Sequence, residues 1–322
     1  MHKSIFLHMF AKYTYLCSPV WGWRIAAAMA KNPSIPHFLP EVQKLKKEYL
    51  FKRYRDVFQK YASLSRERPA NDGPIWVCWW QGEEKMPPLI KGCYNRLLDM
   101  KPADRDVILV SEDNFRNYAD IPEFVLQKLH RRKLTITQFS DILRFCLLLK
   151  HGGLWIDATV WVTAPMKPEI FKSSFYTCRS TDPNIVDTKR VARGKDTPWL
   201  LGSCSGSPIF AICRDIFFDQ WKRYNLSYDY FLIDYCLILI YENIPALREE
   251  MDAGADVQNH LFAMEPLINK PFDEAHFEQL SRQTPFFKLS YKLGGKPLTD
   301  NGELTYFGHF CQYQRKGGAP KD

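Results

Sequence analysis

The sequence contains no pair of cysteines at the C-x-x-C spacing, although nine cysteines occur among its 322 residues. Their number is odd and several lie in apolar runs, which disfavours a disulfide framework or a structural zinc site. Reduced thiols of this kind predict a cytoplasmic protein. The chain also lacks internal repeats and low-complexity tracts, while 46% of its residues are hydrophobic and 15% aromatic. It is therefore expected to bury the large core of a soluble globular protein.

No secretory signal peptide and no run of roughly twenty apolar residues is apparent, so no bilayer-spanning segment is predicted. Residues 4–30 are rich in aromatic residues and alanine, but Lys12 and Arg24 interrupt them. Two interpretations of this segment remain open: contact with the inner face of an anionic membrane, or a helical extension that packs on the rest of the chain. The interface residues of the first interpretation are Phe6, Phe10, Tyr13, Trp21 and Trp23, with Lys3, Lys12, Arg24 and Lys31 near the headgroups.

Basic residues outnumber acidic ones by 44 to 36, which gives a net charge of +8. A positive chain favours anionic partners such as a nucleotide sugar, an acidic glycan or an anionic membrane surface. The sequence has no compact run of Lys and Arg interleaved with aromatic residues, so nucleic acid is not an expected partner.

Strand and helix patterns alternate from residue 75 to residue 162, which predicts a doubly wound α/β sheet. A basic amphipathic pattern at 41–64 predicts a helix, and the charged residues 65–74 have the composition of a linker. The strands expected in the first half are at 75–80, 106–110 and 154–156, with helices at 88–99 and from 121 onward.

These patterns divide the chain into three parts. We expect a helical N-terminal extension at 1–70, a large domain at 71–300 and a C-terminal tail at 301–322. Within the domain we expect a first half at 71–165 and a second half at 166–300.

The string SDILRFCLLLKHGGLWIDATV at 140–160 places ionic side chains at the ends of apolar elements. Asp141 and Arg144 are three residues apart, so they lie on one face of a helix. Gly152 and Gly153 end that helix, and Asp157 follows a short buried strand at the edge where open α/β sheets bind ligands. Two carboxylates and a guanidinium suit a ligand with sugar hydroxyls, phosphates and a metal ion. A structural ion pair, with Asp157 capping a turn, is the alternative.

The pattern SD-x-x-R…GG-x-W-x-D-x-T resembles the signature of the capsular polysaccharide synthesis protein family, over roughly residues 74–300. The resemblance implies a GT-A-like αβα sandwich with a mostly parallel central sheet. It also implies transfer of a sugar from a nucleoside diphosphate, UDP in particular, to a hydroxyl of a capsular or other cell-surface polysaccharide or a lipid-linked glycan. Retention of the anomeric configuration is implied too.

In the resembled enzymes the helical Asp and Arg contact the donor sugar, which implies this role for Asp141 and Arg144, with Ser140 and Gly153 beside them. Asp157 takes the first position of the relatives' DXD motif, so it is the expected ligand of Mn²⁺ or Mg²⁺. Thr159 stands at the third position of the motif, in place of the relatives' second aspartate. A hydroxyl there is a weaker ligand for a hard cation than a carboxylate. A metal contact of Thr159 is therefore expected at most through water.

Trp79 and Gln81 follow the first strand, where an indole offers a stacking face for a nucleobase and an amide offers hydrogen bonds to its edge. The resemblance implies that Trp79 stacks on uracil, whereas Trp80 is expected in the core. The alternative is that both tryptophans are core residues.

Two further parts of the resemblance lie in the second half. Asp234, in the string DYFLIDY, is expected to be an acceptor-side or donor-sugar carboxylate. Lys288 or Lys292, in the string FKLSYK, is expected to neutralise the diphosphate leaving group. No residue stands out as a nucleophile. The alternative functions are a transferase that glycosylates protein, and a non-catalytic glycan-assembly or binding protein with a degenerate donor pocket.

Overall fold

The structure, a computed structural model, describes residues 3–31, 39–62, 71–181, 191–192, 196–292 and 294–316. Most of the predicted linker at 65–74 and the end of the predicted tail lie outside these residues.

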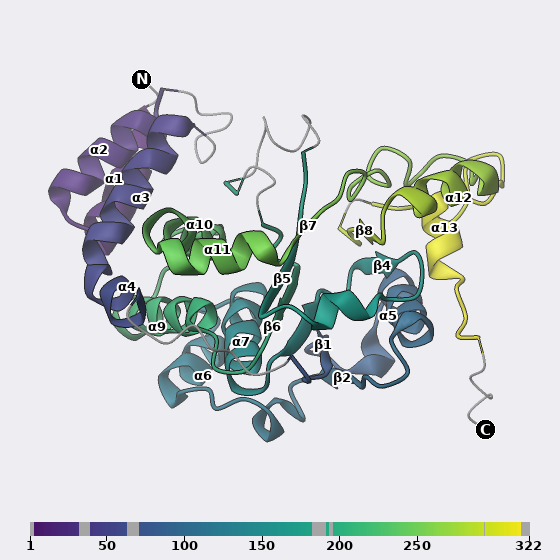
Figure 1. Cartoon of the computed structure of the whole chain (residues 1–322). Helices are drawn as coiled ribbons and strands as arrows, with labels where there is room; N and C mark the ends of the chain where they lie inside the picture. Colours follow the sequence, from purple (N-terminus) through teal and green to yellow (C-terminus); the bar gives the residue numbers. More distant parts are fainter. Residues whose placement is uncertain are drawn as a thin grey trace.

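A six-stranded sheet forms the centre of the molecule, in the order β2-β1-β3-β6-β5-β7 (Figure 1). Five of its strands run in one direction, and β6 runs antiparallel to both of its neighbours. The mainly parallel α/β sheet predicted from the sequence is thus confirmed. The alternation of helices and strands ends at β3, because the next element after it is another strand. The strands are β1 (Ile75–Cys78), β2 (Val107–Val110), β3 (Gly153–Ile156), β5 (Phe175–Arg179), β6 (Leu200–Ser203) and β7 (Ala255–Val257).

Helices cover both faces of this sheet. Trp76 of β1 packs into a core shared with the helices of one face, whereas its neighbours Ile75 and Val77 pack into a second core on the face of α5. This alternation is the two-residue period of a strand buried on both sides. The helices of the domain are α5 (Pro88–Met100), α6 (Glu123–His130), α7 (Ile136–His151), α9 (Pro208–Arg223), α10 (Leu232–Asn243), α11 (Pro245–Ala253), α12 (Glu274–Gln283) and α13 (Tyr306–Cys311), with 3₁₀ turns η2 (Glu83–Lys85), η3 (Phe115–Asn117) and η4 (Pro168–Phe171).

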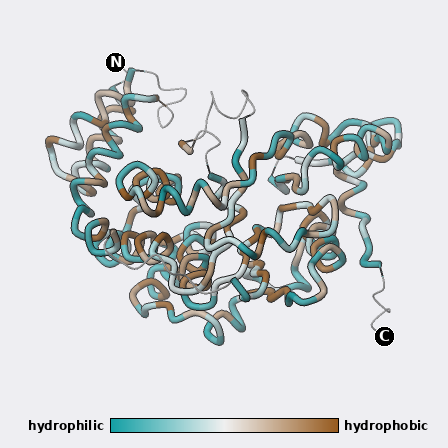
Figure 2. The backbone as a smooth tube through the Cα atoms, in the orientation of Figure 1, coloured by the Kyte–Doolittle hydropathy of each residue, from teal (hydrophilic) through white to brown (hydrophobic). Residues whose placement is uncertain are grey.

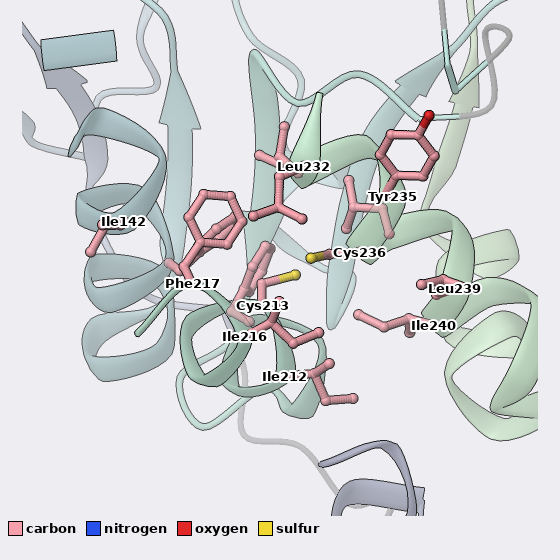
Figure 3. Close-up of a cluster of buried hydrophobic side chains, with 14 of the residues drawn as sticks. Ile142, Ile212, Cys213, Ile216, Phe217, Leu232, Tyr235, Cys236, Leu239 and Ile240 are labelled. Atoms are coloured by element: carbon pink, nitrogen blue, oxygen red, sulfur yellow. The ribbon is translucent and has the colours of Figure 1, made fainter. Parts of the chain in front are cut away.

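The larger core lies where α7, α9 and α10 meet. Ile142, Phe217 and Leu232 come from these three helices and lie close together within the cluster of Figure 3. Hydrophobic residues gather along these helices and around the sheet, as Figure 2 shows. All nine cysteines are free.

A second, two-stranded sheet lies beside the first and matters for the site. Its strands β4 (Val160–Val162) and β8 (Phe286–Lys288) are antiparallel, with Val160 opposite Lys288. β4 begins three residues after Asp157, so this pairing brings a distant part of the chain next to the predicted motif.

Four helices precede the sheet: α1 (Lys3–Leu16), α2 (Pro19–Met29), α3 (Pro40–Arg53) and α4 (Arg55–Ala62). The single helix predicted at 41–64 is two, because the backbone of Tyr54 leaves the helical conformation (φ −107°, ψ 21°). Tyr13 is fully buried in the same core as α9 and α10, which confirms packing of this extension on the domain and removes Tyr13 from any membrane interface. None of the helices in the described part of the chain combines the length and hydropathy needed to cross a bilayer.

A buried ion pair joins these N-terminal helices to the domain. Lys46 of α3 contacts Asp229 just before α10, and their side chains are 0% and 1% exposed. The other carboxylate oxygen of Asp229 accepts a hydrogen bond from the backbone N–H of Phe231 at 2.9 Å. Asp229 therefore caps the turn that leads into α10 and also neutralises a buried lysine.

We predict that Lys46→Met will lower the free energy of unfolding by about 3–5 kcal/mol, because it removes the ammonium that neutralises the buried Asp229 carboxylate. The adjacent Lys47→Met is the matched control, since Lys47 pairs with Glu242 at 2.5 Å at the surface and should contribute at most about 1 kcal/mol. Denaturant unfolding measures both. Equal small losses in the two variants would contradict a structural role for the buried pair.

Candidate active site

A cavity of about 780 Å³ opens at the carboxyl ends of β1 and β3, where α/β sheets bind ligands. Its wall is built by segments that are far apart in the sequence. They are 78–81 after β1, 136–144 in the first half of α7, 157–159 after β3, 196–199 before β6, 230–234 at the start of α10, and Lys288 and Tyr291 near β8.

Asp157 is the centre of the charged wall. Its Oδ1 accepts hydrogen bonds from Arg144 Nη2 at 3.1 Å and Trp155 Nε1 at 2.9 Å, and its Oδ2 accepts one from Lys288 Nζ at 2.7 Å. Burial alone would raise the pKa of this carboxyl, but the charges of Lys288 and Arg144 outweigh burial and lower it. Asp157 is therefore an anion at neutral pH.

Lys288 reaches this position through the small sheet. Pairing of β4 with β8 sets Lys288 opposite Val160, and the backbone N–H of Leu289 donates to the carbonyl of Thr159 at 2.9 Å. As a result Lys288 Nζ lies 2.6 Å from Thr159 Oγ1 as well as beside Asp157. Lys288 lines the cavity; Lys292 is exposed and outside its wall.

Arg144 is buried between two carboxylates, that of Asp141 on α7 and that of Asp157 after β3. Its Nη1 is 3.5 Å from Asp141 Oδ1, its guanidinium lies 4.8 Å from the centre of the Trp155 ring, and it also donates to the carbonyl of Pro198. The helix that carries Arg144 starts at a capping box, because Thr135 ahead of α7 and Gln138 in its first turn bond each other's backbone. Asp141 and Arg144 thus face the cavity as the sequence predicts.

Asp141 and Asp234 form a second pair of carboxyls in the wall, with properties unlike those of Asp157. Burial raises the pKa of Asp141 to about 7, and the negative charge of Asp157 adds to the increase. Burial, together with the charge of Asp141, likewise raises the pKa of Asp234 to about 7. Both carboxyls therefore change charge near neutral pH.

Three of the remaining predicted residues line the cavity. Trp79 is half-buried, its indole N–H donates to the carbonyl of Lys85 at 3.2 Å, and its ring meets the Tyr291 ring edge-on at 5.7 Å. Gln81 is exposed at the rim, and Ser140 donates its hydroxyl to the carbonyl of Thr137 at 2.7 Å.

Two residues near the motif belong to the core or the backbone framework. Trp80 is buried against Phe115 and Phe139, as expected. Gly153 lies at the start of β3, at the opposite end of the strand from Asp157, and outside the cavity. Its φ is +96° and a Cβ there would lie 2.1 Å from the carbonyl oxygen of Pro74, so glycine is required by the backbone rather than by a ligand.

The predicted metal ligands do not fit a divalent cation as they lie. The ammonium of Lys288 occupies the space between Asp157 and Thr159, and Arg144 holds the other carboxylate oxygen. Among the described residues, no three His, Cys, Asp or Glu side chains come together as a metal-binding group. A hard cation needs several oxygen ligands. Here Asp157 is already paired with two positive charges, and Thr159 accepts from the ammonium of Lys288.

Sequence reasoning missed Trp155, whose indole N–H donates to Asp157. Residues two apart on an extended strand share a face, so this contact was readable from the spacing of the motif. The carbonyl of Pro198 and the rings of Trp199 and Tyr230 also line the cavity. No signal in the sequence connects them to the motif.

The profile of the family described as "Capsular polysaccharide synthesis protein" matches residues 28–310. The chain is also similar to "Inositol phosphoceramide mannosyltransferase 3" of Schizosaccharomyces pombe, with 23% identity over 203 residues. That alignment covers 62% of this chain and 51% of the relative, so the chain spans about half the length of that protein. Together the two matches support a glycosyltransferase relationship.

We predict that Asp234→Asn will raise the thermal midpoint, and more so at about pH 8 than at about pH 5. The folded-state pKa of about 7 lies above the ordinary value for aspartate, so ionisation of Asp234 weakens the folded state as pH rises through the interval between them. Asparagine removes that cost. Thermal melts at the two pH values test this, and a midpoint gain that is the same at both would contradict it.

Proposed function

Because this chain belongs to the capsular polysaccharide synthesis protein family, we propose that it is a glycosyltransferase. It moves a hexose from a nucleoside diphosphate, UDP in the first instance, to a hydroxyl of a capsular or other cell-surface glycan, with retention of configuration. The observation that carries the proposal is the cavity at the carboxyl ends of β1 and β3. Its wall includes the aromatic ring of Trp79, the cations of Arg144 and Lys288, and the carboxyls of Asp141, Asp157 and Asp234.

Each group suits one part of a nucleotide sugar. Trp79 offers a face on which a base stacks, and Gln81 offers a donor and an acceptor to the base edge. Lys288 and Arg144 supply positive charge for the diphosphate. Asp141 and Asp234 accept hydrogen bonds from sugar hydroxyls on the donor or acceptor side.

The chemistry requires orientation and charge stabilisation rather than a protein nucleophile. Holding donor and acceptor together makes the reaction effectively unimolecular. Groups already aimed at the leaving diphosphate need no rearrangement as negative charge develops there. The paired network around Asp157 supplies such a preorganised wall.

The relative named above is a mannosyltransferase whose name specifies a lipid, inositol phosphoceramide, as acceptor. This similarity favours mannose as one of the transferred sugars and a lipid-linked glycan as one of the acceptors. A lipid-linked acceptor also suits a protein placed at the inner face of the cytoplasmic membrane.

We predict turnover of at least one member of a panel of UDP-linked and GDP-linked hexoses, including mannose, with the new linkage in the anomeric configuration of the donor. Asp141→Asn and Asp157→Asn should each lower the rate on the order of a hundredfold or more. The first removes an acceptor for a sugar hydroxyl, and the second removes the anion that positions Arg144 and Lys288. Product analysis by NMR gives both rate and configuration. If no donor in the panel is turned over or hydrolysed, the assembly-protein alternative is favoured instead.

The N-terminal helices carry the features expected of membrane contact. Residues 1–31 contain no Asp or Glu, and Leu7, Val20 and Trp23 are each more than half exposed. The basic residues Lys3 and Arg24 are also exposed on these helices. Apolar side chains beside positive charge are the combination that binds an anionic bilayer surface.

The protein is expected to sediment with vesicles that contain anionic lipid and to stay in solution with neutral ones. Leu7→Ser combined with Trp23→Ser should reduce sedimentation several-fold, since these changes remove apolar area that enters the interface. Lys150→Met, which removes an exposed ammonium paired with Asp120, is the control and should have no effect. Equal sedimentation of the double variant and the unmodified protein would contradict this membrane surface.

A further inference from the structure

We propose that the ammonium of Lys288 takes the place of the divalent cation in this site, so that the donor diphosphate is bound and its leaving charge neutralised without metal. The inference rests on the proposed function and deepens it. It assigns to one lysine, held by Asp157 and Thr159, the part that a metal ion plays between two carboxylates of a DXD motif.

The position of Nζ carries the inference. It lies 2.7 Å from Asp157 Oδ2 and 2.6 Å from Thr159 Oγ1, between the first and third residues of the motif. A threonine at the third position accepts a hydrogen bond from an ammonium readily, whereas it is a poor ligand for a hard cation. Thr159 and Lys288 are therefore complementary to each other.

The local charge supports the same conclusion. Asp157 brings one negative charge, and Arg144 and Lys288 bring two positive charges, so the three together carry a net positive charge. Asp141, 3.5 Å from Arg144, offsets this charge only when it is ionised. A nucleoside diphosphate is attracted to such a cluster, whereas a divalent cation would be repelled by both neighbours of the carboxylate. The site thus binds the anion directly.

Lys288 can make these contacts and still reach the ligand. An ammonium has three N–H donors, of which Asp157 and Thr159 receive two in the described contacts. The side chain lines the cavity and is 19% exposed, with Nζ 5.8 Å from the centre of the Trp199 ring. The third donor is directed to a phosphate oxygen when a donor is bound.

The bond changes then balance without a metal. The bond between the anomeric carbon and the diphosphate oxygen breaks, and its electron pair remains on that oxygen. The acceptor oxygen bonds to the anomeric carbon, and its proton passes to the departing diphosphate. Lys288 keeps its proton throughout and acts through its charge and its hydrogen bond.

The first test is calorimetry, which measures the affinities of UDP, GDP and the two corresponding nucleosides. Each ligand is titrated once in EDTA and once in Mn²⁺. We expect the affinity for the nucleotide that binds to agree within about twofold in the two conditions. A loss of about tenfold or more in EDTA would overturn the inference while leaving the proposed function in place. If neither nucleotide binds in either condition, the proposed function fails and the inference fails with it.

The second test separates a phosphate contact from a structural ion pair. Lys288→Met should weaken binding of the nucleoside diphosphate roughly tenfold to a hundredfold and leave the nucleoside unchanged, because only the diphosphate meets the ammonium. Trp79→Ala should instead weaken both by about tenfold, since it removes the stacking face. Lys150→Met is the matched control for loss of a lysine that pairs with an aspartate, and should change neither. Equal losses for nucleotide and nucleoside in Lys288→Met would overturn the inference.

The third test asks whether a metal dependence appears when the ammonium is removed. If Lys288→Met folds poorly, the first test still decides the inference, because it uses the unmodified protein. The double change Thr159→Asp with Lys288→Met replaces the ammonium by a second carboxylate. Its nucleotide affinity should rise about tenfold or more on adding Mn²⁺, whereas that of the unmodified protein should not change. Lys288→Arg, which retains the charge, should keep binding independent of metal. If Mn²⁺ raises the nucleotide affinity of the unmodified protein as much as that of the double variant, the inference that Lys288 replaces the metal is wrong.

Discussion

The carboxylate of Asp157, whose side chain is 28% exposed in the cavity wall, makes the interactions on which the site depends. A carboxylate that is partly removed from water is costly unless it is paired and hydrogen-bonded. Arg144 from α7, Trp155 from β3 and Lys288 from β8 all donate to it. One anion therefore holds a helix, the central sheet and the small second sheet in a single arrangement, and the cavity is the space that this arrangement leaves.

A buried ion pair supports a further segment of the cavity wall. Lys46 of α3 meets Asp229, five residues before Asp234 in the segment that lines the wall. The N-terminal helices thus support the turn that delivers Asp234 to the cavity. They are part of the framework of the site as well as a candidate surface for membrane contact.

The same environment divides the carboxyls of the wall into two kinds. Asp157 has two cationic partners, and its pKa falls in spite of burial. Burial dominates at Asp141 and Asp234, whose pKa values rise to about 7. Carboxyls whose environments push their pKa values apart can serve different roles in one site, one as a permanent anion and the others as neutral or charged hydrogen-bonding groups.

The sequence by itself determined the first strands and helices of the sheet and the association of Asp141, Arg144 and Asp157. These features depend on residue periodicity and on one helix–turn–strand unit, whose geometry is local. Only the tertiary structure decided the reversed direction of β6, the exclusion of Gly153 from the cavity and the meeting of Lys288 with Asp157, 131 residues apart. Strand pairing and charge burial between distant segments set those features, and neither leaves a signal in neighbouring residues.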